Sequence, residues 1–123
     1  MVGKTIQEVK DYLEKTYPGQ LAKKEHQEEF EKIKPETEDW VCYFFFGSFL
    51  RYSSGSWYVP DSFWDGSGFG RHAYWPDHDW LSDYRVVLLE TFEKVDSLKQ
   101  PFDSLDIEIK INGKTYVLKE KNL

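Results

Sequence analysis

The chain has 123 residues, of which 40% are hydrophobic and 31% are charged, and its formal net charge is -6 at pH 7. This length suits one domain with one core, and the hydrophobic share is too high for a disordered chain. The acidic balance, with no basic run longer than Lys23-Lys24, argues against binding to nucleic-acid backbones or anionic membranes, because both need clustered Lys and Arg.

The N-terminal segment predicts a helix from about Thr5 to Thr16. Thr5 and Glu8 have the spacing of a capping box, in which two side chains satisfy backbone N–H groups at the helix start. Apolar side chains follow at helical spacing, namely Ile6, Val9, Leu13 and Tyr17. Pro18-Gly19 is expected to end the helix, since both residues break regular structure.

The next segment, Gln20 to Lys34, predicts a second and mostly solvated helix. Lys, Glu and Gln dominate it, and Leu21, Phe30 and Ile33 are its few apolar anchors. Pro35 is expected to close it, because the residue before a proline disfavours the helical conformation.

Three strand-like runs follow. Residues 39–46 are rich in aromatic and β-branched side chains and predict a buried strand. Residues 49–52 and 57–59, separated by small residues, predict a second hairpin or an extended continuation. Pro60 is expected to stop this strand, since proline cannot donate to a strand ladder.

From Pro60 to Trp75 we expect a long irregular loop, because three glycines interrupt it and no periodicity is visible. All five tryptophans of the chain fall between residues 40 and 80. Long loops in small domains are usually functional or disordered, and the aromatic content argues against disorder.

The segment from Pro76 to Leu98 predicts a third helix. A helical template places most apolar residues between Trp80 and Leu98 on one face, and Pro76 suits the first helical position. Asp77 and Asp79 would then lie where the helix dipole favours negative charge. Residues 84–91 contain a continuous apolar run that on its own suits a strand, so this alternative stays open.

The C-terminal segment predicts a β-hairpin, since Asn112-Gly113 between alternating segments is a strong signal for a two-residue turn. The expected pairs on its apolar face are Ile111 with Lys114, Ile109 with Tyr116 and Ile107 with Leu118. The expected pairs on its polar face are Asp106 with Lys119 and Lys110 with Thr115.

Together these elements predict a single small α+β domain over residues 1–123. An antiparallel sheet that ends in the Asn-Gly hairpin would pack with two N-terminal helices and with one helix near 76–98. No internal repeat or linker divides the chain, and its motifs indicate no known family. The acidic, low-cysteine composition is typical of small bacterial or phage proteins.

Cys42 is the only cysteine, which excludes an intramolecular disulfide and a metal site with several thiolates. The N-terminus has no apolar signal core, and no apolar run approaches the roughly 18 residues of a membrane span. We therefore expect a cytoplasmic protein. Cys42 lies in an apolar strand and is expected to be an inert core thiol, although His26, His72 or His78 could approach it.

The aromatic and polar residues between 57 and 75 are the candidate binding residues. Exposed Trp and Tyr provide large and rigid contact area, so they dominate interface hot spots and stack on sugars and bases. The candidates are Trp57, Tyr58, Trp64, Asp65, Phe69, Arg71, His72, Tyr74 and Trp75. In the alternative interpretation the aromatic members form a satellite core beneath the loop, and partial exposure would decide between the two.

Other chemistry has weaker support in the sequence. Residues 66–70 lack the ending and the glycine spacing of nucleotide-binding loops. His72, Asp77, His78 and Asp79 have metal-ligand or acid-base chemistry, but their spacing matches no metalloenzyme motif. The carboxylates of Asp61, Asp65 and Asp77 could serve a glycosidase, but so small a chain leaves little cleft.

These observations favour a non-enzymatic binding protein of the inhibitor, immunity or antagonist kind. It would engage a protein partner with a basic surface through the aromatic loop. The first alternative is a domain that binds a nucleotide- or sugar-like ligand, and the second is a small metal-assisted hydrolase that uses His72 and His78. We assign no catalytic residue, cofactor or metal site, expect no membrane partner, and leave the oligomeric state open.

Overall fold

The structure is a computed structural model that describes residues 1–32, 35, 37–51, 55–91, 104–111 and 114–123. The strands are β1 (Val41–Phe44), β2 (Leu50–Arg51), β3 (Trp57–Trp64), β4 (Phe69–Tyr74), β5 (Tyr84–Thr91), β6 (Ser104–Ile111) and β7 (Lys114–Asn122). The helices are α1 (Ile6–Thr16), the 3₁₀ turn η1 (Lys24–His26) and α2 (Gln27–Phe30). The fold is therefore α+β, as the sequence predicts.

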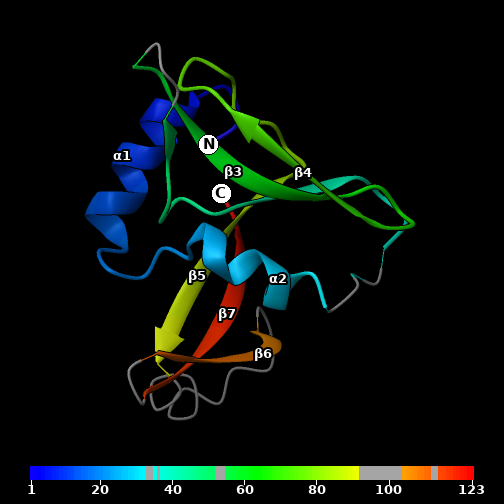
Figure 1. The fold of residues 1–123 in the computed structure, drawn as a ribbon. Coiled ribbons are helices and arrows are strands. Elements are labelled where there is room, and N and C mark those ends of the chain that lie inside the picture. Colours follow the sequence, from blue (N-terminus) through cyan, green and yellow to red (C-terminus); the bar gives the residue numbers. More distant parts are fainter. Residues whose placement is uncertain (33–34, 36, 52–54, 92–103, 112–113) are drawn as a thin grey trace.

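The described strands form one mixed sheet in the order β2-β3-β1-β5-β7-β6, with β4 paired to β3. Within it β1 and β5 run parallel and the other neighbouring strands are antiparallel, so the sheet is mixed rather than antiparallel as the sequence predicted. Figure 1 shows the β3–β4 hairpin towards one end of the sheet and β6 at the other. The two termini lie side by side, and the N-terminal ammonium group donates to the carbonyl of Leu123.

The first helix is confirmed, and its start is fixed by the predicted capping box. The hydroxyl of Thr5 accepts from the N–H of Glu8 at 3.2 Å, and the Glu8 carboxylate accepts from the N–H of Thr5 at 3.1 Å. Its buried face consists of Ile6, Val9 and Leu13, which are fully covered by one face of the sheet. Spacing and cap together were therefore sufficient to place this helix.

The solvated helix expected over Gln20 to Lys34 is wrong in type and extent. The first residues of that segment are extended beside β5, where Ala22 donates to Val87 and Leu89 donates to Gln20. Helical structure covers only η1 and α2, and His26 and Gln27 within it are buried. The polar composition of the segment gave no sign of this burial, because a segment that hydrogen-bonds to a sheet need not be apolar. Ile33 and Lys34 lie outside the described residues.

The two central strands are buried on both faces. From β1 onward, alternate side chains contact α1 on one side and α2 on the other, so that Phe44 belongs to the first core and Phe45 to the second. In β5 the same alternation separates Val86 from Val87. Strands covered on both sides have continuous rather than alternating apolar sequences.

The helix expected from Pro76 to Leu98 is also wrong, because β5 occupies residues 84–91 as a strand. The helical spacing of the apolar residues was coincidental, and the continuous apolar run reflects two-sided burial between β1 and β7. Pro76 begins a turn rather than a helix, and its carbonyl accepts from the N–H of Gln7. Residues 92–98 lie outside the described residues.

The long loop expected from Pro60 to Trp75 is instead the β3–β4 hairpin. Pro60 does not stop β3, because its missing N–H faces the side where β1 has already ended, and its carbonyl accepts from Phe45 at 3.0 Å. The turn is held by Asp65, whose carboxylate accepts from the N–H groups of Ser67 and Gly68. Gly66 adopts a φ of 95°, which favours glycine.

The remaining strand pairings agree in part with those predicted from the sequence. The hairpin of β2 and β3 is confirmed, with Leu50 opposite Tyr58. In the C-terminal pair β6–β7, Ile111 lies opposite Lys114, Ile109 opposite Tyr116 and Lys110 opposite Thr115, as expected. The register then shifts, so Lys119 faces Ser104 rather than Asp106. Asn112 and Gly113 themselves lie outside the described residues.

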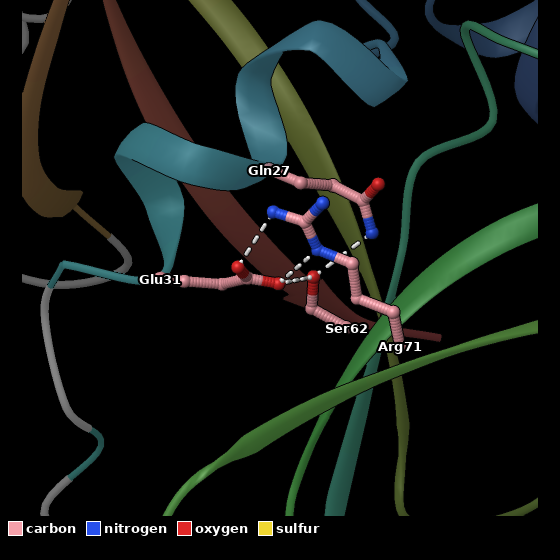
Figure 2. Close-up of polar contacts among 4 residues, drawn as sticks. All are labelled: Gln27, Glu31, Ser62 and Arg71. Atoms are coloured by element: carbon pink, nitrogen blue, oxygen red, sulfur yellow. Dashed lines mark hydrogen bonds and ion pairs between the residues drawn. The ribbon is translucent and has the colours of Figure 1, made fainter.

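A polar cluster ties α2 to the β3–β4 hairpin (Figure 2). The amide of Gln27 donates to the hydroxyl of Ser62 at 3.0 Å, and that hydroxyl donates to Glu31 at 2.6 Å. Arg71 binds both carboxylate oxygens of Glu31, at 2.8 and 2.9 Å. Burial raises the pKa of Glu31, but the hydrogen bonds from Arg71 and Ser62 outweigh it and leave the pKa below its ordinary value.

This cluster predicts unequal costs for two substitutions. Ser62→Ala should lower the free energy of unfolding by about 1–3 kcal/mol, because Ser62 and Gln27 are buried and the amide loses its partner. Arg71→Ala should cost only about 0–1 kcal/mol, because the Arg71 side chain is 50% exposed. Urea unfolding of both variants checks the order, and a larger loss for Arg71→Ala would contradict it.

Candidate functional site

Six ring side chains form a continuous row on the α1 face of the β3–β4 hairpin, which we call the aromatic row: Trp40, Phe63, His72, Tyr74, Trp75 and His78. Trp40 stacks on Phe63 with ring centroids 4.8 Å apart, and Phe63 stacks on His72 at 4.1 Å. His72 and Tyr74 follow at 6.0 Å, and His78 contacts both Tyr74 and Trp75, at 4.7 and 5.1 Å. Neighbouring rings thus support one another along the whole row.

The register of the hairpin explains why these rings meet. Asp61 lies opposite His72, and Phe63 lies opposite Gly70, so alternate residues of both strands point to the same face. The Phe63 ring lies across the backbone of Gly70, where a Cβ would be 2.6 Å from Cε1 of that ring. Glycine at this position therefore makes room for the centre of the row.

The two ends of the row are open to solvent and acidic. Trp40 is 44% exposed and Trp75 is 47% exposed, although both rings have fixed neighbours. Asp39 stands next to Trp40, Asp77 and Asp79 follow Trp75, and all three carboxylates are exposed. None of them forms an ion pair within the part of the chain that the structure describes. The surface thus combines indole rings with unpaired negative charge.

A buried carboxyl group lies beneath the middle of the row. Asp61 is 0% exposed; its Oδ1 accepts from the N–H of His72 at 3.0 Å, and its Oδ2 has no partner among the described residues. Burial raises the pKa of Asp61 to about 7, against smaller lowering effects of the His72 N–H and the Cys42 thiol. Buried carboxyl groups are normally fully hydrogen-bonded, so an unsatisfied one requires an explanation.

Other polar groups of the core lie around this carboxyl. The Cys42 thiol interacts with Asp61 and with the hydroxyl of Tyr74, and the rings of Tyr74 and Tyr84 lie with their centroids 5.7 Å apart. His78 completes the series, with its Nε2 2.7 Å from the Tyr84 hydroxyl. Burial is the main cause that raises the pKa of Cys42 and of Tyr84 to about 12, so both remain protonated at neutral pH.

The sequence-based candidates divide into three groups. His72, Tyr74 and Trp75 belong to the aromatic row. Trp64 is 4% exposed and, with Phe69, packs in the core on the α2 face, where its indole N–H donates to the Thr37 carbonyl at 2.7 Å.

The third group lies away from the row or at its margin. Trp57 and Tyr58 are half-buried near the start of β3, Asp65 holds the turn, and Arg71 pairs with Glu31 on the opposite face. Hydrogen bonds from Ser67 and Gly68 lower the pKa of Asp65, which is consistent with a structural role in the turn. The aromatic segment therefore contains both exposed rings, such as Trp75, and core rings, such as Trp64.

Sequence reasoning assigned no role to Trp40 or Phe63, and it treated Asp61 as a loop carboxylate, whereas Asp61 is fully buried in β3. Two signals could have found them. The Asp65-Gly66 dipeptide between aromatic runs is a hairpin signal, and alternation from residue 59 to residue 64 would then have placed Asp61 and Phe63 on one face. The contact of Trp40 depends on the β1–β3 pairing, which no local pattern indicates.

The enzyme interpretation gains no support from this geometry. No three His, Cys, Asp or Glu side chains gather to hold a metal ion in the described part of the chain. The Cys42 thiol is buried, and its raised pKa disfavours the reactive thiolate. His72 and His78 lie in the aromatic row with Tyr74 between them.

No helix in the described ranges combines the length and apolar character needed to cross a membrane. No family model, curated protein or solved structure matches the chain. The function has therefore to be argued from the site itself.

The position of Gly70 predicts a specific effect on the row. Gly70→Ala should displace the Phe63 ring and lower the free energy of unfolding by about 1–3 kcal/mol, because the new methyl group overlaps a packed ring. Gly68→Ala is the matched control, since nothing lies within 4 Å of a Cβ there. Urea unfolding and the indole signal of Trp40 in NMR spectra report both effects. Equal behaviour of the two variants would contradict the close packing.

The buried Asp61 predicts that stability falls as pH rises. An unfolded aspartate releases its proton near pH 3.9, whereas the folded group holds it until about pH 7. Between these values the unfolded state binds fewer protons, so the free energy of unfolding decreases with pH, by about 4 kcal/mol for three pKa units.

Asp61→Asn should remove this component, because the amide does not titrate. Urea unfolding at several pH values between 4 and 8 measures the difference between the two proteins. The free energy of unfolding of the variant, relative to that of the wild type, should increase up to about pH 7 and then stay constant. Parallel stability curves for the two proteins would show that Asp61 titrates normally.

Proposed function

We propose that the chain is a non-enzymatic binding protein that engages a protein partner through the aromatic row. The observation that carries this proposal is the pair of ordered but exposed indole rings, Trp40 and Trp75, at the two ends of one supported row. Tryptophan, together with tyrosine and arginine, is enriched among interface hot spots.

The row is suited to binding because its rings are already held in place. The indole N–H of Trp40 donates to Sγ of Cys42 at 3.2 Å, and the ring stacks on Phe63 with an interplanar angle of 16°. At the other end, Trp75 meets the edge of His78. Side chains that are fixed before association lose little conformational entropy on binding, so more of the contact energy appears as affinity.

The charges around the row favour a basic partner surface. Asp39 lies at one end, and Asp77 and Asp79 lie at the other, all exposed. Complementary charge would speed association and exclude acidic partners, while the apolar contact of the rings would slow dissociation. An inhibitor, an immunity protein or an antagonist works through such a surface, without chemistry of its own.

The test compares exposed rings inside and outside the row. Trp40→Ala and Trp75→Ala should each weaken partner binding by about 2 kcal/mol or more, because hot-spot rings carry most of the contact energy. The partner is captured with the immobilised wild-type chain and identified by mass spectrometry, and its Kd is then measured for every variant by surface plasmon resonance. Unfolding curves verify that each variant keeps its fold.

Tyr12→Ala serves as the matched control, since Tyr12 is 40% exposed but lies on α1 outside the row. It should leave the Kd unchanged. If the captured partner binds both tryptophan variants as tightly as the wild type, the proposal fails. If the control weakens binding instead, the contact surface lies on α1.

A further inference from the structure

We propose that the aromatic row binds an organic cation, an ammonium or guanidinium group, over the buried carboxyl of Asp61. The inference names the chemical group that a partner would insert, and in that respect it rests on the proposed function. The same cation chemistry can be supplied by a Lys or Arg side chain of a protein or by a free amine, and the experiment below separates these sources.

The first support is the distribution of the chain's own cations over its rings. Lys10 lies over the rings of Phe49 and Trp57, at 5.2 and 5.8 Å from their centroids, and Lys121 lies over Tyr17 at 5.5 Å. Within the described ranges no such cation lies over Trp40 or Trp75, which are the two most exposed tryptophans. Indole faces attract cations more strongly than other rings do.

The second support is the unsatisfied carboxyl beneath the row. Oδ2 of Asp61 is buried without a hydrogen-bond partner in the described structure, and the nearby Cys42 thiol is only a weak donor. An N–H donor that carries positive charge would satisfy this oxygen with a charge-assisted hydrogen bond. A neutral sugar offers a weaker donor than a cation does, and the ionised carboxyl would repel an anion.

The third support is the way in which the carboxyl is covered. Asp61 lies opposite His72, whose ring is exposed and stacks on Phe63. His72 belongs to β4, which pairs only with β3 among the described strands. A cation that approaches from this side would therefore meet one exposed side chain on a strand with a single described neighbour before it reaches the carboxyl.

The surrounding charge supports the same ligand class. Asp39, Asp77 and Asp79 are exposed and unpaired in the described part of the chain, so a cation would meet attractive charge along the row. The exposed acidic residues would raise the local concentration of cations, and the buried one would hold the bound group.

The experiment uses matched probes on the whole chain. N-acetyl-argininamide represents a protein side chain, tetramethylammonium represents a free amine, and N-acetyl-citrullinamide is the uncharged counterpart of the first. Each is titrated at constant ionic strength, and the indole N–H signals of Trp40 and Trp75 are followed by NMR. The charged probes should shift these signals with saturation, and the citrulline probe should not. The tighter of the two charged probes then assigns the source.

Variants locate the bound cation. Asp61→Asn should weaken the binding of the arginine probe at least about tenfold, because a charge-assisted bond is replaced by a neutral one. His72→Ala should strengthen it, because the covering ring is gone. The triple variant Asp39→Asn, Asp77→Asn and Asp79→Asn changes exposed residues only, so it tests the charge contribution even if Asp61→Asn fails to fold.

Three results would overturn the inference: no saturable shift with either charged probe, equal binding of the citrulline probe, or unchanged affinity in folded Asp61→Asn. These results are distinguishable from failure of the proposed function. If partner binding depends on Trp40 and Trp75 while no cation binds, only the cation inference fails. If cations bind while the partner's Kd is unchanged by the two tryptophan substitutions, only the proposed protein contact fails.

Discussion

Two-sided burial of the central strands is the constraint on which the rest of the structure depends. Phe44 and Phe45 of the β1 segment are fully buried on opposite faces, as are Val86 and Val87 of β5. A sheet that is apolar on both faces must be covered on both. Helix α1 covers one face, and η1 with α2 covers the other, so the polar segment before β1 is drawn into the core rather than left in solvent.

The β3–β4 hairpin meets the same constraint by other means. On the α2 face, the buried Ser62 and Gln27 connect the hairpin to the helix through hydrogen bonds. On the α1 face, the ring of Phe63 stacks on that of His72, which lies opposite Asp61 in the strand register. The rings at this edge of the sheet pack against the core on one side only and remain partly exposed on the other. The aromatic row is thus exposed because the β3–β4 hairpin, rather than a helix, covers this part of the core.

The sequence predicted the elements that are specified locally and missed those that depend on distant partners. The capping box of α1 and the strand around Cys42 need only their own residues. The burial of His26 and Gln27 and the strand state of 84–91 arise from pairing with segments far away in the chain. Of the candidate site, the aromatic residues after 70 were predicted. The contact of Trp40 and the burial of Asp61 were not, because both depend on strand register.

Two buried side-chain oxygens lack a hydrogen-bond partner in the described residues, Oε1 of Gln27 and Oδ2 of Asp61, and of the two only Asp61 is an ionisable group. An apolar side chain of similar size would fill its position, on a strand between Val59 and Phe63, without the cost of an unsatisfied oxygen. Folded proteins break such local rules mainly where function requires it, and the cost is then met by stability elsewhere. In the free protein, the unsatisfied carboxyl lowers the free energy of unfolding. A bound cation would supply the missing hydrogen bond, and the free energy regained would add to the affinity for that cation. The same group under a permanently closed row would only destabilise the fold. Whether Asp61 binds a cation or only destabilises the fold therefore depends on whether the exposed side chain of His72, opposite Asp61, lets a cation pass.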